Sequence, residues 1–150
     1  MAPAETPSRP PASIFDRFPM PPASALLGWR LRAVDTAAGT IEIGFEVDGR
    51  FANPGGYVQG GFLAAMLDDT QGPALFAMTD GRVYAPTVDF SISFLKPASP
   101  GRFVGKGRVV NLGKTIVFTE AELFDEAGDL VARATFTSRA RRRDVADGKD

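Results

Sequence analysis

Residues 53–68, which read NPGGYVQGGFLAAMLD, place a glycine-rich loop directly before an apolar segment that carries an acid. From Gly60 to about Met78 the apolar side chains recur every three to four residues, which predicts a helix with one buried face. Pro73 lies inside this segment and cannot donate a hydrogen bond to the carbonyl of Asp69, so we expect a kink or a break there. The loop and the helix, with its acid Asp68, form the centre of the predicted fold.

Segments in which apolar and polar residues alternate flank this helix and predict β-strands. Residues 40–47 alternate most clearly, because Ile41, Ile43, Phe45 and Val47 fall on one face. Two strands are predicted before the helix and four after it, over residues 29–34, 40–47, 83–95, 102–110, 115–124 and 130–140. The sequence therefore predicts an α+β fold with one long helix on an antiparallel sheet of about six strands. One helix cannot cover both faces of such a sheet, so the other face needs water or a partner.

The two ends of the chain differ in composition from its middle. Residues 1–24 contain seven prolines, which exclude a regular helix or a central strand. We interpret this stretch as an extended arm with a turn around residues 14–18. Its aromatic side chains offer packing against the domain or a partner, but a poorly ordered terminus is the favoured interpretation. Residues 25–140 form the predicted domain, and residues 141–150 are a charged tail that we expect to fray.

Composition excludes several classes of function. The 150 residues fit one domain, and a net charge of −1 gives no overall reason to expect nucleic acid as a partner. The chain has no histidine and no cysteine, which excludes Ser-His-Asp and Cys-His triads, disulfides and histidine-based metal sites, so no metal is expected. No apolar run approaches the ~20 residues of a membrane helix, and a signal-peptide pattern is absent. We therefore expect a cytoplasmic protein without a membrane partner.

The start of the predicted helix offers backbone N–H groups to a ligand. These groups lack partners within the helix, and Gly60 and Gly61 have no side chain to block an approaching carbonyl oxygen. A tight turn that merely requires two glycines explains the pattern equally well. Asp68 follows Gly60 by eight residues, which is about 12 Å along a helix, so one small carbonyl cannot touch both. Either the two serve separate purposes, or a second copy of the chain brings its own helix alongside.

Asp68 and Asp69 interrupt an apolar helix, and neighbouring helical residues point about 100° apart, so we expect only one of them to line a site. The alternative is two solvated surface acids. Thr87 begins the polar face of its predicted strand. If the apolar face meets the helix, Thr87 faces away from it and toward a partner, where its hydroxyl could hold a water; an ordinary strand threonine is the stronger interpretation from the residues alone.

Taken together, the motifs resemble a known family. The pattern of Asn53, six residues, Gln59-Gly60-Gly61 and then Asp68 is similar to hotdog-fold acyl-CoA thioesterases of the phenylacetate-degradation type, in which histidine usually precedes the two glycines. Residues 87–97, 113–115 and 125–132 resemble the family as well, and the resemblance covers roughly residues 27–138. It implies a long helix wrapped by a curved antiparallel sheet, in dimers that often pair into tetramers, with active sites between subunits.

The resemblance also implies roles for individual residues. The Gly60 N–H and the Asn53 side chain would hold the thioester oxygen, and Asp68 of the neighbouring subunit would act as general base on water or attack the carbonyl itself. Thr87 stands where relatives place a hydroxyl residue that orients the water. The substrate would be an acyl-CoA, so no separate cofactor is expected. The residues we expect to contact it are Tyr57, Gly61, Phe62, Asp69 and Lys114.

Gln59 is a departure from the family pattern. Glutamine donates and accepts hydrogen bonds but carries no proton at neutral pH, so it cannot act as an acid toward the leaving thiolate. Because a coenzyme A thiolate leaves readily, hydrolysis without that acid is the favoured hypothesis. A binding protein for acyl-CoA or a small ligand on the same fold is the alternative. A hydratase ranks low because it would need the missing histidine, and a purely structural oligomer leaves the motif unexplained.

Overall fold

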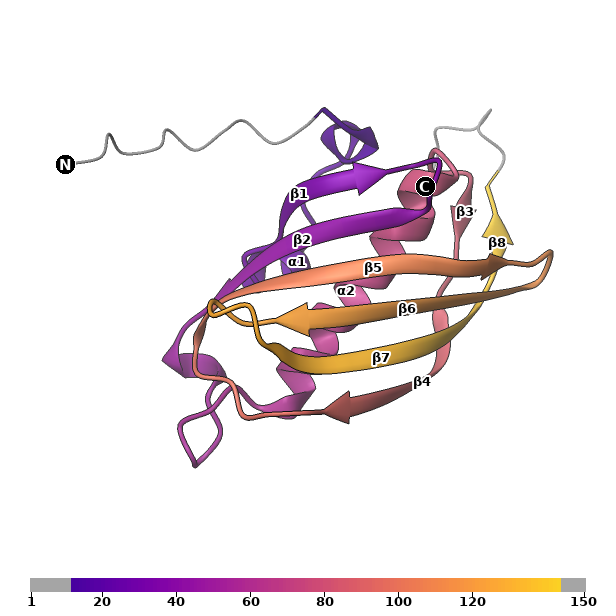
Figure 1. Ribbon diagram of the computed structural model, residues 1–150. Helices are drawn as coiled ribbons and strands as arrows, with labels where there is room; N and C mark the ends of the chain where they lie inside the picture. Colours follow the sequence, from indigo (N-terminus) through magenta and orange to yellow (C-terminus); the bar gives the residue numbers. More distant parts are fainter. Residues whose placement is uncertain (1–11, 144–150) are drawn as a thin grey trace.

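The computed structural model describes residues 12–143, which form a six-stranded sheet, a smaller two-stranded sheet and one long helix (Figure 1). Six antiparallel strands run in the order β1-β2-β5-β6-β7-β4. Their bounds are β1 (Arg30–Asp35), β2 (Thr40–Val47), β4 (Thr87–Phe94), β5 (Gly101–Leu112), β6 (Ile116–Phe124) and β7 (Leu130–Arg139). The helix α2 (Gly60–Met78) lies against one face of the sheet, mainly on β5, β6 and β2. The predicted α+β architecture is confirmed. In the part of the chain described, no helix is long and apolar enough to cross a membrane.

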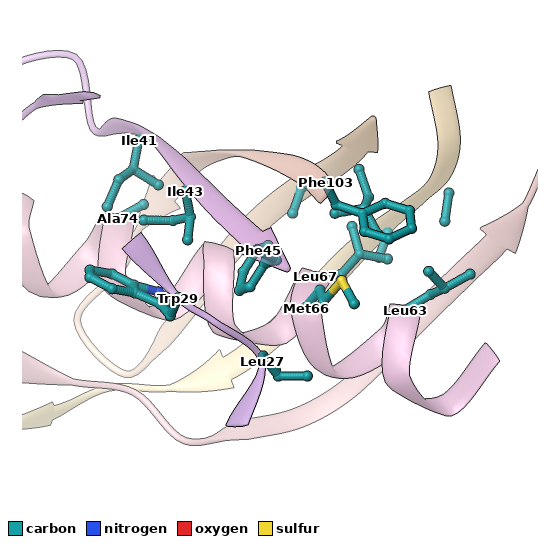
Figure 2. Close-up of a cluster of buried hydrophobic side chains, with 14 of the residues drawn as sticks. Leu27, Trp29, Ile41, Ile43, Phe45, Leu63, Met66, Leu67, Ala74 and Phe103 are labelled. Atoms are coloured by element: carbon teal, nitrogen blue, oxygen red, sulfur yellow. The ribbon is translucent and has the colours of Figure 1, made fainter. Parts of the chain in front are cut away.

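The core fills the space between α2 and the sheet. Strand β2 contributes Ile41, Ile43, Phe45 and Val47, all of them buried, as its alternation predicts. The helix contributes Leu63, Met66 and Leu67 from its first half and Ala74 and Leu75 from its second. Figure 2 shows several of these side chains together with Leu27, Trp29 and Phe103.

Helix α2 continues through Pro73 for all of its 19 residues, so of the predicted kink or break, the break is wrong. Pro73 has no N–H to donate to the carbonyl oxygen of Asp69, four residues earlier. The indole Nε1–H of Trp29 donates to that oxygen instead, at 3.1 Å. A tertiary hydrogen bond thus replaces the one that proline removes, and the carbonyl is not left unpaired.

Two strand glycines let α2 approach β5 closely. A Cβ placed on Gly105 would collide with Oγ1 of Thr70, and one on Gly107 would lie 3.0 Å from the Thr70 carbonyl oxygen. Thr70 is fully buried, and its hydroxyl donates to the carbonyl of Met66 at 2.7 Å. The short distance between helix and sheet at this point therefore requires glycine, which has no side chain, at both strand positions.

We expect Gly105→Ala to lower the free energy of unfolding by about 1–3 kcal/mol, because the added methyl overpacks a rigid contact. Chemical unfolding of both proteins in urea measures this difference. Gly44→Ala in β2 is the matched control, since the nearest atom to its added Cβ, in the Arg32 side chain, is 3.5 Å away, an ordinary contact. Equal losses in the two variants would contradict the overpacking argument.

The predicted strand over residues 83–95 is two strands, β3 (Val83–Tyr84) and β4, separated by Ala85 and Pro86. The pairing of β4 with β7 shifts between Thr87 and Asp89, which marks a β-bulge. Thr87 lies opposite the buried Ser138 and Phe90 opposite the buried Phe136, so both face the helix side of the sheet. The expectation that Thr87 faces away from the helix is wrong, because the bulge resets the alternation of side chains.

The N-terminal segment packs on the domain. Residues 1–11 of the predicted arm lie outside the described residues, but residues 14–17 form the 3₁₀ helix η1 (Ile14–Arg17) and a further turn forms α1 (Pro22–Leu26). The side chain of Ser13 caps η1 by accepting from the N–H of Phe15 at 3.2 Å. The Phe15 ring lies 5.3 Å from that of Trp29 and 6.2 Å from that of Phe76. The interpretation as a poorly ordered terminus is therefore wrong for residues 12–24, because aromatic packing holds them.

The predicted tail is also ordered at its beginning. Strand β8 (Arg141–Arg142) pairs with β3, next to the end of β7 (Figure 1). Residues 144–150 lie outside the described residues. A short 3₁₀ helix, η2 (Gly49–Phe51), completes the elements and leads into the loop before α2.

The face of the sheet away from α2 carries charges in the middle. Arg102 pairs with Glu46, Lys106 with Glu42 and Arg108 with Glu120, at 3.7, 3.6 and 2.6 Å. This part of the uncovered face suits contact with water. The edge strand β4 also exposes apolar side chains, since Val88, Phe90 and Phe94 are 68%, 47% and 54% exposed, but Phe90 and Phe94 lie on the helix side of the sheet.

Candidate active site

Asp68 stands at the centre of a hydrogen-bonded network on the sheet side of α2. Its Oδ1 accepts from the Thr87 hydroxyl at 2.9 Å and from Nε2 of Gln71 at 2.9 Å. Among residues 12–143, no hydrogen bond engages its second oxygen, Oδ2. The carboxylate is exposed although both of its partners are anchored. One oxygen is thus fixed by the protein, and the other is available to a water or a substrate.

Gln71 connects this network to the sheet. Its side chain is buried, and its Oε1 accepts from the buried hydroxyl of Thr119 on β6 at 2.7 Å. Because Oε1 receives that bond, the amide N–H groups must point the other way, toward Asp68 and toward Thr87 at 3.2 Å. The sheet therefore sets the position of the carboxylate through one amide.

Sequence reasoning identified Asp68 and Thr87 but missed Gln71 and Thr119. Residues three apart in a helix are neighbours on its surface, so the spacing of Asp68 and Gln71 was a usable signal. The partner of Thr87 was not predictable, because its direction depends on the bulge in β4. Thr119 lies 48 residues from Gln71, and no local pattern joins them.

A cavity of about 570 Å³ opens beside Asp68. Helix α2, the N-terminal segment and the link from β3 to β4 all contribute to its wall. Most of the lining is apolar or aromatic, and the carboxyl-bearing side chains are Asp68 and Asp69. The lining includes Phe15, Phe18, Met20, Leu27, Trp29, Phe76, Tyr84 and Thr87. A mostly apolar cavity with a few polar groups at one point is the usual form of a small-molecule site.

Asp69 also lines this cavity, although only one of the two acids was expected there. Burial raises the pKa of Asp69 to about 6, the hydroxyl of Ser24 opposes that shift, and the neighbouring charge of Asp68 adds to it. Its Oδ2 is buried and has no hydrogen-bond partner among the described residues. The acid is thus held in a poorly solvated wall of the cavity, beside the better solvated Asp68.

The predicted oxyanion group lies elsewhere in the same chain. Asn53 Oδ1 accepts from the backbone N–H groups of Gly55 and Tyr57, at 2.9 and 3.2 Å, and so holds its own loop. Gln59 is the exposed N-cap residue of α2, without a side-chain capping bond. The backbone N–H groups of Gly60 and Gly61 make no backbone hydrogen bond among the described residues. None of these residues lines the cavity at Asp68.

The remaining predicted contacts do not line the cavity either. Tyr57 is 44% exposed in the loop before α2, and Phe62 packs edge-on against Phe51 with ring centres 4.8 Å apart. Lys114 is exposed in the turn between β5 and β6. Within one chain, the structure brings together Asp68, Asp69 and Thr87 from the predicted set, and leaves the loop residues apart. Among residues 12–143, no group of three potential metal ligands occurs.

Comparison with known proteins identifies the family. The sequence profile of the thioesterase superfamily matches residues 55–132. Human acyl-coenzyme A thioesterase 13 is 30% identical over 112 residues, which are 72% of this chain and 78% of that protein. A relative from Saccharolobus solfataricus is 32% identical over 94 residues, and the aligned part spans 63% of this chain and 65% of that relative.

Solved structures agree with the family match. A phenylacetic acid degradation-related protein from Ralstonia eutropha JMP134 superimposes with a TM-score of 0.79 at 36% identity, over 84% of this chain and 95% of that one. The PaaI protein of the Escherichia coli phenylacetic acid degradation operon superimposes with a TM-score of 0.71 at 20% identity, over 81% of this chain and 83% of that one, which shows the shared fold. The chain therefore belongs to the thioesterase superfamily, with the hotdog fold and the thioester-hydrolase class that the resemblance implied.

Proposed function

We propose that this protein hydrolyses acyl-CoA thioesters to a free acid and coenzyme A, with Asp68 as the reacting carboxylate. The observation that carries the proposal is the arrangement of Asp68. One of its oxygens is fixed by Gln71 and Thr87, and the other is open beside a mostly apolar cavity. The human relative with 30% identity is an acyl-coenzyme A thioesterase, which supports a CoA ester as the substrate.

In this mechanism the Oδ2 atom of Asp68 takes a proton from a water as that water attacks the thioester carbonyl. The carbonyl oxygen becomes an oxyanion, the carbon–sulfur bond then breaks, and the sulfur leaves as the thiolate of coenzyme A. Direct attack by the carboxylate, followed by hydrolysis of the resulting anhydride, gives the same products. The apolar cavity would hold the acyl group. No acid is needed at Gln59, because a thiol gives up its proton far more readily than an alcohol does, so coenzyme A leaves as the thiolate.

The oxyanion would be held by a second copy of the chain. Gly60 lies too far along α2 to reach a carbonyl at Asp68 of the same chain, and the cavity lining lacks Asn53 and Gly60. The edge strand β4 supports association, because no strand of the described residues pairs with its outer side and it exposes Val88, Phe90 and Phe94. In the proposed dimer, the Gly60 N–H and the Asn53 amide of one subunit face Asp68 of the other. Pairing of such dimers into tetramers remains part of the proposal.

Thiol release tests the proposal directly. We expect the protein to release coenzyme A from at least one member of a panel of short-chain, medium-chain and aromatic acyl-CoAs, detected with a thiol-reactive dye. Calorimetric titration with the same acyl-CoAs measures binding separately. Binding without thiol release from any substrate would reject hydrolysis and favour the non-catalytic binding protein. That alternative is suggested by the glutamine at position 59, where the family usually has histidine.

A further inference from the structure

Three arginines gather on one side of the short β3–β8 pair. Tyr84 lies opposite Arg141 in this pair, and the N–H of Arg143 donates to the carbonyl of Arg82 at 2.7 Å, which continues the alignment by one step on each strand. Residues opposite each other, and those two positions away, share a face of a β-ribbon. Arg82, Arg141 and Arg143 therefore surround Tyr84 on one face, and all four side chains are exposed. We call these four residues the arginine face.

The arginine face has no acidic partner within the described part of the chain. Among residues 12–143, no acid forms an ion pair with Arg82, Arg141 or Arg143. Arg108 on the outer surface of the sheet differs, because it bonds to Glu120. Like charges placed opposite each other across two strands repel and destabilise the pairing. A bound anion would relieve this repulsion, which gives the cluster the character of an anion site.

The arginine face adjoins the cavity that Asp68 lines. Tyr84 is 57% exposed and also lines that cavity, together with Thr87. Arg82 precedes Thr87 by five residues, which span at most about 16 Å of extended chain. A ligand with a reacting carbonyl at Asp68 and a flexible linker of this length would place its far end on the arginines.

We propose that the arginine face binds the phosphate groups at the nucleotide end of the thioester substrate. Guanidinium groups match phosphate oxygens with two parallel hydrogen bonds each, and the exposed Tyr84 ring offers a surface on which a base can stack. The pantetheine arm of coenzyme A supplies the linker between phosphates and thioester. This inference rests on the proposed function, since it takes the occupant of the cavity to be the acyl end of the same molecule.

A variant with Arg141→Gln and Arg143→Gln tests the inference. We expect its KM for an acyl-CoA to rise roughly tenfold or more, because charge-assisted hydrogen bonds to phosphate are lost. The wild type should prefer acyl-CoA over the acyl-pantetheine thioester, which lacks the phosphates, and the variant should lose that preference. Arg133→Gln is the matched control, because Arg133 is exposed on β7 away from the cavity lining, and it should keep wild-type values.

Direct binding separates this inference from the proposed hydrolysis. Calorimetric titration with free coenzyme A requires no turnover, and we expect the double variant to bind it roughly tenfold more weakly than the wild type does. Raising the salt concentration should weaken wild-type binding and close the gap, because the site is exposed to solvent. Equal affinity for coenzyme A in wild type and double variant, or equal rises in KM for the acyl-CoA and acyl-pantetheine thioesters, would overturn the assignment.

Discussion

Replacing Asp68 by asparagine is expected to lower kcat for acyl-CoA hydrolysis about a thousandfold, within the range that general bases contribute. Asparagine keeps an oxygen that can accept from Thr87 and Gln71, so the network and the fold are retained. The atom in place of Oδ2 becomes an amide nitrogen, which can neither take a proton from water nor attack a carbonyl. Thiol release measures the loss, and thermal unfolding shows whether the variant is folded. A folded variant with near wild-type turnover would reject Asp68 as the reacting group.

The same variant tests whether two chains share a site. Asn53→Ala should also be nearly inactive, because one donor to the oxyanion is lost. When the two inactive variants are mixed and allowed to exchange subunits, each mixed dimer contains one site with both residues intact. A two-fold symmetric dimer with random exchange then regains about a quarter of the wild-type activity. A mixture that stays as inactive as its components would place both groups in sites within single chains.

Replacing Gln71 by methionine is expected to lower kcat about a hundredfold while leaving KM nearly unchanged. Methionine fills a similar volume but cannot donate to Asp68 or to Thr87, so the carboxylate loses its fixed orientation. Gln71 contacts Asp68 and not the reacting atoms, so its role is to position the carboxylate. Steady-state kinetics with one acyl-CoA separates the two parameters. A rise in KM with constant kcat would show that Gln71 acts on substrate binding instead.

Thr119→Val provides the matched control for Gln71. Valine has nearly the same shape as threonine but cannot donate to Oε1 of Gln71, so the amide is free to turn over. We expect kcat to fall in the same direction as in Gln71→Met, by a smaller factor, since the amide remains within reach of Asp68. Full activity in Thr119→Val would show that Gln71 holds its orientation without the sheet.

Most of the fold was predictable because its elements have strong periodic patterns. The alternation in Ile41, Ile43 and Phe45 identifies a half-buried strand, and the spacing along α2 identifies the helix. The continuity of that helix was not predictable. It depends on the hydrogen bond from Trp29 to the Asp69 carbonyl, and these residues are 40 positions apart. A local rule for proline cannot include a partner supplied by tertiary structure.

The candidate site was predictable only in part, for a related reason. Asp68 stands out as an acid in an apolar helix, and the family resemblance indicates Thr87. The direction of Thr87 depends on a bulge that adds one residue to β4, and no turn residue marks it in the sequence. Packing of Phe15 and Phe18, which form part of the cavity wall, was an alternative that the sequence left open but did not favour, because seven prolines exclude regular structure there. Proline excludes regular structure but leaves aromatic side chains free to dock.

The position of Trp29 gives the protein a built-in optical probe. It is the only tryptophan in the chain, its indole N–H is bonded to the helix that carries Asp68, and its ring forms part of the cavity wall. Indole emission depends on the polarity around the ring, so an acyl group that displaces water from the cavity changes the fluorescence of a single, assigned residue. Occupation of the cavity can therefore be followed in the unlabelled protein, separately from any release of thiol.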